Sequence, residues 1–117
     1  MTQAAALNWY SVRCVFIGRP PDRPHYIYEE RITVWQAPSP EAAIAKAEEE
    51  AEQYVEVFEN DTYVGMAQCY WMYDELRDGA EVFSLMRDST LEPDEYVKTF
   101  FRTGAEHEGD VSESPEP

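Results

Sequence analysis

Two adjacent glutamates, Glu29 and Glu30, are the residues with the clearest potential for chemistry, and they lie in the alternating run HYIYEERITVWQ at residues 25–36. Side chains alternate between the two faces of a strand, so one of the two carboxylates must point toward the core side of the sheet. Burial raises a carboxyl pKa, so an inward glutamate could act as a general acid or base. The candidate pocket combines Glu30 with Tyr28 and with Arg13 or Arg31. Alternatively, the inward glutamate pairs with an arginine such as Arg13 or Arg87, or lies at the rim of the sheet, and has a structural role.

Other catalytic and metal-binding patterns are absent from the sequence. The two histidines are His25, which follows a proline-rich loop, and His107, and no Cys or His stands at ligand spacing from His25. The scattered glycines form no phosphate-binding loop, and no serine stands in a nucleophile elbow. Cys14 and Cys69 each lie in an apolar run, which favours buried free thiols in a reducing compartment. We therefore predict no catalytic residue, no metal site and no cofactor, and an enzyme is the less favoured interpretation.

Charge is the strongest global feature of the chain. Its 117 residues include 24 acidic and nine basic side chains, which gives a formal net charge of −15. Such a chain repels nucleic acid and anionic membranes, whose binding depends on Lys and Arg, and it favours a basic partner or high solubility. Part of the charge forms a stripe on a predicted helix, made of Glu41, Glu48, Glu49, Glu52, Glu56 and Glu59. This acidic stripe is either a solvated helix face or a docking surface.

The elements that position these residues begin with a predicted antiparallel hairpin. Residues 8–18 and 25–36 alternate with period two, and the loop RPPDRP between them cannot pair as a strand because proline lacks a backbone donor. If Val12, Cys14 and Phe16 face the helices, we expect the other face of the sheet to be open. The aromatic and arginine residues predicted for this open face, which would form an interaction surface, are Trp9, Arg13, Arg31, Trp35 and Tyr70.

The remaining elements complete a predicted α+β domain. Ser39-Pro40-Glu41 is a strong helix start, and apolar spacing continues the helix to Asn60. Strands are predicted over 62–73 and 81–87, and a short helix over 93–102. The expected order is ββαββα, with a four-stranded antiparallel sheet and both helices on one face. We expect a flexible N-terminus at 1–7, a single domain at 8–104 and a disordered acidic tail at 105–117.

Four segments give the sequence a family resemblance. They are WYSVRCVF at 9–16, EERITVWQAPSPEAAIAKAEEEA at 29–51, GAEVFSLMRDSTL at 79–91 and YVKTFFRTG at 96–104. The chain resembles a family of small bacterial proteins known as domain of unknown function 4288, over most of residues 8–104. The resemblance implies a single α+β domain of cytoplasmic type. The family has no established activity, so the resemblance implies no catalytic or binding residues.

Three functions are compatible with the sequence. The leading hypothesis is a non-enzymatic module of a bacterial cytoplasm that binds a basic protein, as an immunity-type protein would, or binds a second copy through the open face. The second is a small-ligand binder or enzyme with a pocket between helix and sheet that uses Tyr28 and Glu30. The least favoured is a single-stranded nucleic-acid binder, because the net charge opposes it. No apolar run approaches the roughly 18 residues of a membrane helix, so we expect no membrane contact.

Overall fold

The computed structural model describes residues 6–109. The chain divides into two compact units, Met1–Leu85 and Met86–Pro117, and each is described by itself. The predicted flexible N-terminus and acidic tail extend beyond the described residues, into 1–5 and 110–117. The single domain over 8–104 therefore stays a prediction.

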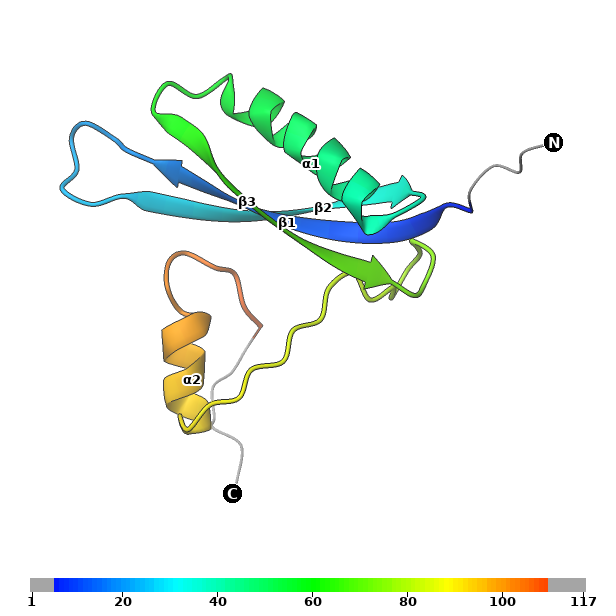
Figure 1. Ribbon diagram of the computed structural model, residues 1–117. Helices are drawn as coiled ribbons and strands as arrows, with labels where there is room; N and C mark the ends of the chain where they lie inside the picture. Colours follow the sequence, from blue (N-terminus) through cyan, green and yellow to red (C-terminus); the bar gives the residue numbers. More distant parts are fainter. Residues whose placement is uncertain (1–5, 110–117) are drawn as a thin grey trace. The chain divides into compact units, whose positions relative to one another are not determined.

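The first unit contains a three-stranded antiparallel sheet. Its strands are β1 (Asn8–Gly18), β2 (Ile27–Ala37) and β3 (Asp61–Met72), and their order across the sheet is β2-β1-β3 (Figure 1). β1 is central because both of its faces are largely apolar, and it is the most buried of the three strands. β1 and β2 form the predicted long hairpin, joined by the proline-rich loop, with Gly18 opposite Ile27.

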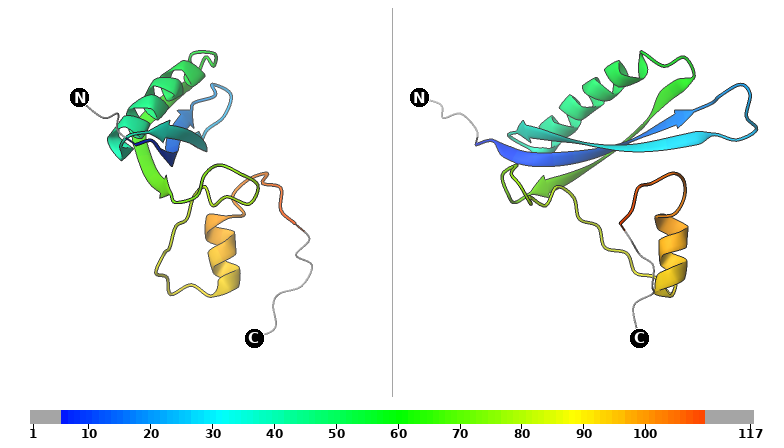
Figure 2. Two further views of the ribbon diagram at one scale, coloured as in Figure 1. Left: turned by 90° about the vertical axis from the view of Figure 1, so that its right-hand side faces the viewer. Right: turned by 180° about the vertical axis from the view of Figure 1, so that it is seen from behind.

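The helix α1 (Pro40–Val55) covers one face of this sheet, as the views in Figure 2 show. It begins as predicted, because the Ser39 hydroxyl accepts a hydrogen bond from the backbone N–H of Ala42 at 3.1 Å and Pro40 occupies the first turn. It ends at Val55 and not at Asn60. The last turn carries no basic residue, and the glutamates there lie at the negative end of the helix dipole, which disfavours extension.

The core of this unit lies between α1 and the sheet. Three alanines spaced four residues apart on α1 allow the helix to approach the sheet closely, and their exposed fractions are 1% or less. The sheet contributes one side of β1, where the predicted inward residues are buried, together with the end of β2. The buried cluster consists of Tyr10, Val12, Cys14, Phe16, Ala37, Ala43, Ala47 and Ala51.

The predicted fourth strand over 81–87 is wrong, and so is the ββαββα order. Residues 73–85 form no strand, although they follow β3 directly. Gly79 has φ +84° and turns the chain within this segment. The segment is instead held by side chains: the Phe83 ring lies 5.8 Å from the Tyr70 ring, and the Tyr70 hydroxyl donates to Glu81 at 3.0 Å. Aromatic side-chain contact thus replaces a backbone ladder.

The second unit contains the helix α2 (Pro93–Phe100), close to the predicted bounds of 93–102. Tyr96 packs against Phe100 at 4.7 Å between ring centroids, and the Arg87 guanidinium lies 4.3 Å from the Phe100 ring centre and donates to the Tyr96 hydroxyl at 3.0 Å. None of the residues of α2 is fully buried. Throughout residues 6–109, helices are too short or too polar to cross a membrane.

Candidate functional site

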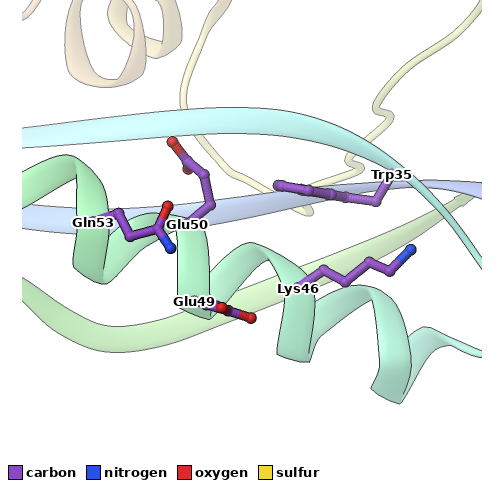
Figure 3. A pocket seen from close by; sticks show the side chains of 5 residues that line it. All are labelled: Trp35, Lys46, Glu49, Glu50 and Gln53. Atoms are coloured by element: carbon purple, nitrogen blue, oxygen red, sulfur yellow. The ribbon is translucent and has the colours of Figure 1, made fainter.

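An open groove of about 390 Å³ lies between α1 and β2 in the first unit. Trp35 of β2 forms one wall, and four polar residues of α1 form the other (Figure 3). The groove also contains the Lys46 ammonium, which donates to the backbone carbonyl of Gln36 at 2.8 Å. We call this feature the acidic groove, and its lining residues are Trp35, Lys46, Glu49, Glu50 and Gln53.

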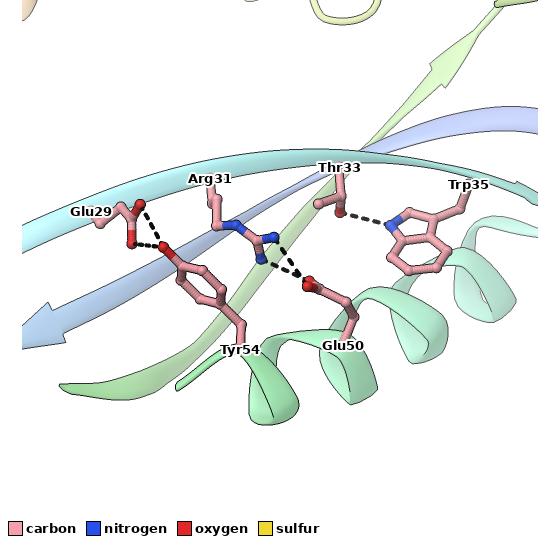
Figure 4. A network of polar contacts seen from close by, with 6 residues as sticks. All are labelled: Glu29, Arg31, Thr33, Trp35, Glu50 and Tyr54. Atoms are coloured by element: carbon pink, nitrogen blue, oxygen red, sulfur yellow. Dashed lines mark hydrogen bonds and ion pairs between the residues drawn. The ribbon is translucent and has the colours of Figure 1, made fainter. Parts of the chain in front are cut away.

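A hydrogen bond orients Trp35 on the sheet side of the groove. The indole Nε1 donates to the Thr33 hydroxyl at 2.7 Å, two residues earlier on the same face of β2 (Figure 4). Glu49 is exposed and makes no ion pair with any residue in 6–109. An indole face and an unpaired carboxylate are the two groups that best accommodate an ammonium or guanidinium group.

A polar network continues from the groove along the underside of β2. The Arg31 guanidinium makes two hydrogen bonds to Glu50, at 2.7 Å and 3.0 Å, and lies 3.8 Å from the Tyr54 ring centre (Figure 4). The Tyr54 hydroxyl donates to the Glu29 carboxylate at 3.0 Å. Hydrogen bonding to Glu50 raises the pKa of Arg31, and desolvation followed by the Glu29 contact raises the pKa of Tyr54. The network thus connects β2 to α1 by charged contacts.

On the side of α1 away from β2, a tyrosine hydroxyl of β3 donates a hydrogen bond to the helix. The Tyr63 hydroxyl donates to Glu48 at 2.7 Å, and the Tyr63 ring packs 5.5 Å from the Phe16 ring. Burial and the Glu48 carboxylate raise the pKa of Tyr63 well above its usual value, because both oppose a second negative charge. Burial also raises the pKa of the Cys14 thiol beside it. Both cysteines are free thiols, Cys14 being buried and Cys69 half-buried.

The predicted acidic stripe is only partly a free surface. Glu48 is half-buried and bonded to Tyr63, while Glu41, Glu49 and Glu52 are exposed on α1. The other two lie beyond the last helical residue, with Glu56 at the C-cap and Glu59 in the loop before β3. The continuous acidic part of the helix is therefore the segment around Glu49 and Glu52, next to the groove.

The predicted open-face set is divided between the two faces of the sheet. Arg13 pairs with Ile32 and Trp9 with Gln36, so Arg31 and Trp35 point the other way, toward α1. Their placement on the open face was therefore wrong. Trp9, Arg13 and Tyr70 do share the open face, since Trp9 lies opposite Met72 and Arg13 opposite Gln68, the neighbours of Tyr70 on that side.

Part of this open face is covered by residues 73–85. The Arg13 guanidinium lies 4.9 Å from the Phe83 ring centre, and it also contacts Gln68 and, at 3.5 Å, Glu30. Ser11 is fully buried beneath this cover, and among the described residues its hydroxyl has no hydrogen-bond partner. On this face Ser11 is therefore buried and Arg13 is half-buried, whereas Ile32 of β2, which lies opposite Arg13, is exposed.

The predicted pocket residues Tyr28 and Glu30 do not lie between helix and sheet. They pair with Ile17 and Val15, so both side chains point to the open face, where both are exposed. Of the two adjacent glutamates, Glu29 is the one that faces α1, and it bonds to Tyr54 and not to an arginine. No group of three or more potential metal-ligating side chains occurs in the described part of the chain.

Two important residues of this site were not singled out from the sequence, Glu50 and Tyr54. Both contact side chains of β2, Glu50 through Arg31 and Tyr54 through Glu29. The spacing of Lys46, Glu50 and Tyr54, four residues apart, was the available signal, because such residues share one helix face.

The sequence matches the model of the family described as domain of unknown function (DUF4288) over residues 9–84. The chain belongs to the DUF4288 family. The DUF4288 match ends one residue before the end of the first unit, so it covers the sheet, α1 and the segment over the open face. Searches of curated proteins and of solved structures each gave no match.

Proposed function

We propose that this protein is a non-enzymatic interaction module that binds a basic partner protein through the acidic groove and the adjoining acidic side of α1. The observation that carries the proposal is that the Trp35 indole and the Glu49 carboxylate, which has no ion-pair partner within residues 6–109, line one open groove. A lysine or arginine side chain gains from both groups at once, through the ring face and through a charge-assisted hydrogen bond.

The charge distribution supports a basic partner. α1 carries five glutamates and a single lysine over Pro40–Val55, and the whole chain has a formal net charge of −15. Such a field accelerates encounter with a basic protein and opposes association with acidic ones. Because the groove is open to solvent, its contribution weakens as salt screens the charges.

The alternative functions have less support. A ligand pocket between helix and sheet would occupy space that Val12 and Phe16 fill against the alanines of α1, and the proposed pocket residues face the other way. A self-association surface made of aromatic and arginine residues on the open face loses Arg31 and Trp35 to the opposite face. Single-stranded nucleic acid on the open sheet face would be repelled by the formal net charge of −15.

Affinity capture from a host lysate tests the proposal, with two charge-reversal variants of equal net charge. Glu49→Lys with Glu52→Lys alters the groove side, and Glu75→Lys with Asp78→Lys alters the exposed loop after β3. We expect a basic protein that is captured at about 50 mM salt and lost by about 300 mM. The groove variant should lose it and the loop variant should retain it. Capture that is independent of salt, or that survives the groove variant, would contradict the proposal.

A further inference from the structure

Within residues 6–109, β2 is an edge strand of the sheet. It pairs with β1 on one side, and no other strand within residues 6–109 pairs with it on the other. Its register with β1 runs without interruption from Asn8 opposite Ala37 to Gly18 opposite Ile27. Such an edge presents a row of unpaired backbone N–H and C=O groups that can pair with an added strand.

Two hydrogen bonds identify which residues present these groups. The Arg19 N–H donates to the Asn60 carbonyl at 3.0 Å, so odd-numbered residues at this end of β1 point their backbone groups toward β3. Backbone direction alternates along an antiparallel strand, so even-numbered β1 residues face β2 and pair with its odd-numbered residues. The even-numbered residues of β2 therefore point outward. The Lys46 bond to the Gln36 carbonyl agrees with this assignment.

The outward residues are Tyr28, Glu30, Ile32 and Val34, with Gln36 at the end already engaged by Lys46. Their side chains point to the open face, whereas those of the odd-numbered residues, including Trp35, point toward α1. In an added antiparallel strand, the residues that bond to the outward positions would share the open face with them. The alternate residues of that strand would project on the α1 side, into the acidic groove beside Trp35 and Glu49.

The other edge of the sheet is less suitable. β3 has three residues, Val64 to Met66, where β1 has only Val15, and its register with β1 shifts at this point. Gly65 at the centre of this bulge has φ +94°. Bulges interrupt the row of edge groups and are a common protection against added strands. The continuous edge and the acidic groove thus occur together on β2.

We propose that β2 binds an extended segment of the basic partner as an added antiparallel strand, with lysine or arginine at alternate positions projecting into the acidic groove. The inference rests on the proposed function and adds its binding mode. Charge complementarity selects this occupant over a second copy of the chain, because two copies would each bring a formal charge of −15 to the interface.

A synthetic peptide of twelve residues that alternates lysine and threonine, labelled with fluorescein, tests the binding mode by fluorescence anisotropy at low salt. Two further peptides carry backbone N-methyl groups, one on every threonine and the other on every lysine. The two have the same charge, composition and number of methyl groups. Methylation of the threonines removes the donors that face β2 and should weaken binding by about tenfold or more, because several hydrogen bonds are lost together. Methylation of the lysines should leave the affinity within about threefold.

The outcomes separate the binding mode from the proposed function. Equal binding of all three peptides, lost in Glu49→Lys, would retain an acidic docking site and overturn strand addition. Loss on methylating the lysines alone would overturn the antiparallel pairing. Binding by none of them would overturn the inference as a whole, and capture of a salt-sensitive basic partner from lysate would then still support the proposed function.

A matched pair of protein variants gives a second test. Ile32→Pro removes one outward N–H, and Ile32→Ala removes the same side chain but keeps the donor. Proline is tolerated on an edge strand where its nitrogen faces solvent, so Ile32→Pro should remain folded. We expect the unmodified peptide to bind Ile32→Ala normally and Ile32→Pro about tenfold more weakly. Amide hydrogen exchange should show that the peptide protects Glu30, Ile32 and Val34, which exchange rapidly in the free protein. Unchanged exchange at these amides would contradict strand addition.

Discussion

The two edge strands of the sheet, β2 and β3, lie on either side of β1 but differ in the continuity of their register and in the side chains that join them to α1. β2 is continuous in register, and its inward residues are joined to α1 by the Arg31–Glu50 pair. β3 is interrupted by the bulge at Gly65 and is joined to α1 by the Tyr63 hydroxyl on Glu48. The difference indicates that the bulge protects the β3 edge against an added strand. The outward backbone groups of β2 can still form hydrogen bonds with one.

The largest expected effect distinguishes inward from outward backbone groups on β2. Thr33→Pro removes an N–H that bonds to β1 and should lower the free energy of unfolding by about 3 kcal/mol or more. Ile32→Pro removes an outward N–H and should lower it by about 1 kcal/mol or less. Urea unfolding measures both, with Thr33→Ala as the control for the lost hydroxyl bond to Trp35. Equal losses in the two proline variants would contradict the assigned alternation and the open edge with it.

The second effect compares the contacts that hold α1 to the two edges. Arg31→Met leaves the half-buried Glu50 without its partner, and we expect a loss of about 1–3 kcal/mol in the free energy of unfolding. Tyr63→Phe removes one hydrogen bond to Glu48 and should cost about 1 kcal/mol. A double-mutant cycle of Arg31→Met and Glu50→Gln measures the interaction energy between Arg31 and Glu50. A larger loss of unfolding free energy in Tyr63→Phe than in Arg31→Met would contradict the expectation that the contact of α1 with β2 is the stronger one.

A third, smaller effect concerns the bulge on β3. Gly65→Ala places a side chain at φ +94°, a conformation that L-residues rarely adopt, although the space around its Cβ is open. The cost should be about 1 kcal/mol and should arise from the backbone alone. Thr62→Ala, exposed on the same strand, is the control and should change the unfolding free energy by about 0.5 kcal/mol or less. A neutral Gly65→Ala would show that the bulge does not need glycine.

The smallest expected effect is a pH dependence that belongs to the β3 side. The folded-state pKa of Tyr63 is raised, so the unfolded chain loses this proton first, near its ordinary pKa of about 10. Stability contributed by the neutral phenol is therefore present below this pH and is lost as the pH rises above it. Thermal unfolding between about pH 9 and about pH 11 should show a decline that is shallower in Tyr63→Phe. An equal decline in both proteins would assign the effect to other groups, Cys14 first among them.

Local sequence signals predicted much of this fold. The hairpin followed from alternation on both sides of a proline-rich loop, and the start of α1 followed from Ser39 and Pro40, whose cap the structure confirms. Both features are determined by residues close together in the sequence, so the sequence alone is enough to predict them. The apolar spacing after Pro40 likewise predicted a helix, although its predicted end at Asn60 lies beyond the observed end at Val55.

The register of the hairpin could not be predicted in the same way. The loop sets it so that odd-numbered residues of β1 lie opposite even-numbered residues of β2, as Arg13 does with Ile32. A shift of one residue would have placed Arg31 and Trp35 on the open face, as first expected. The predicted fourth strand also depended on a contact between distant residues. Phe83 packs its ring against Tyr70 on the face of the sheet, and its backbone pairs with no strand.

The free edge of β2 also has a consequence for the protein at high concentration. A continuous unpaired strand normally invites identical chains to stack on it, which leads to aggregation. Here Glu29 and Glu30 place a carboxylate on each face of that strand, and the chain as a whole carries a formal charge of −15. The negative charge keeps like molecules apart. Solubility and recognition would then have a common origin in the same carboxylates.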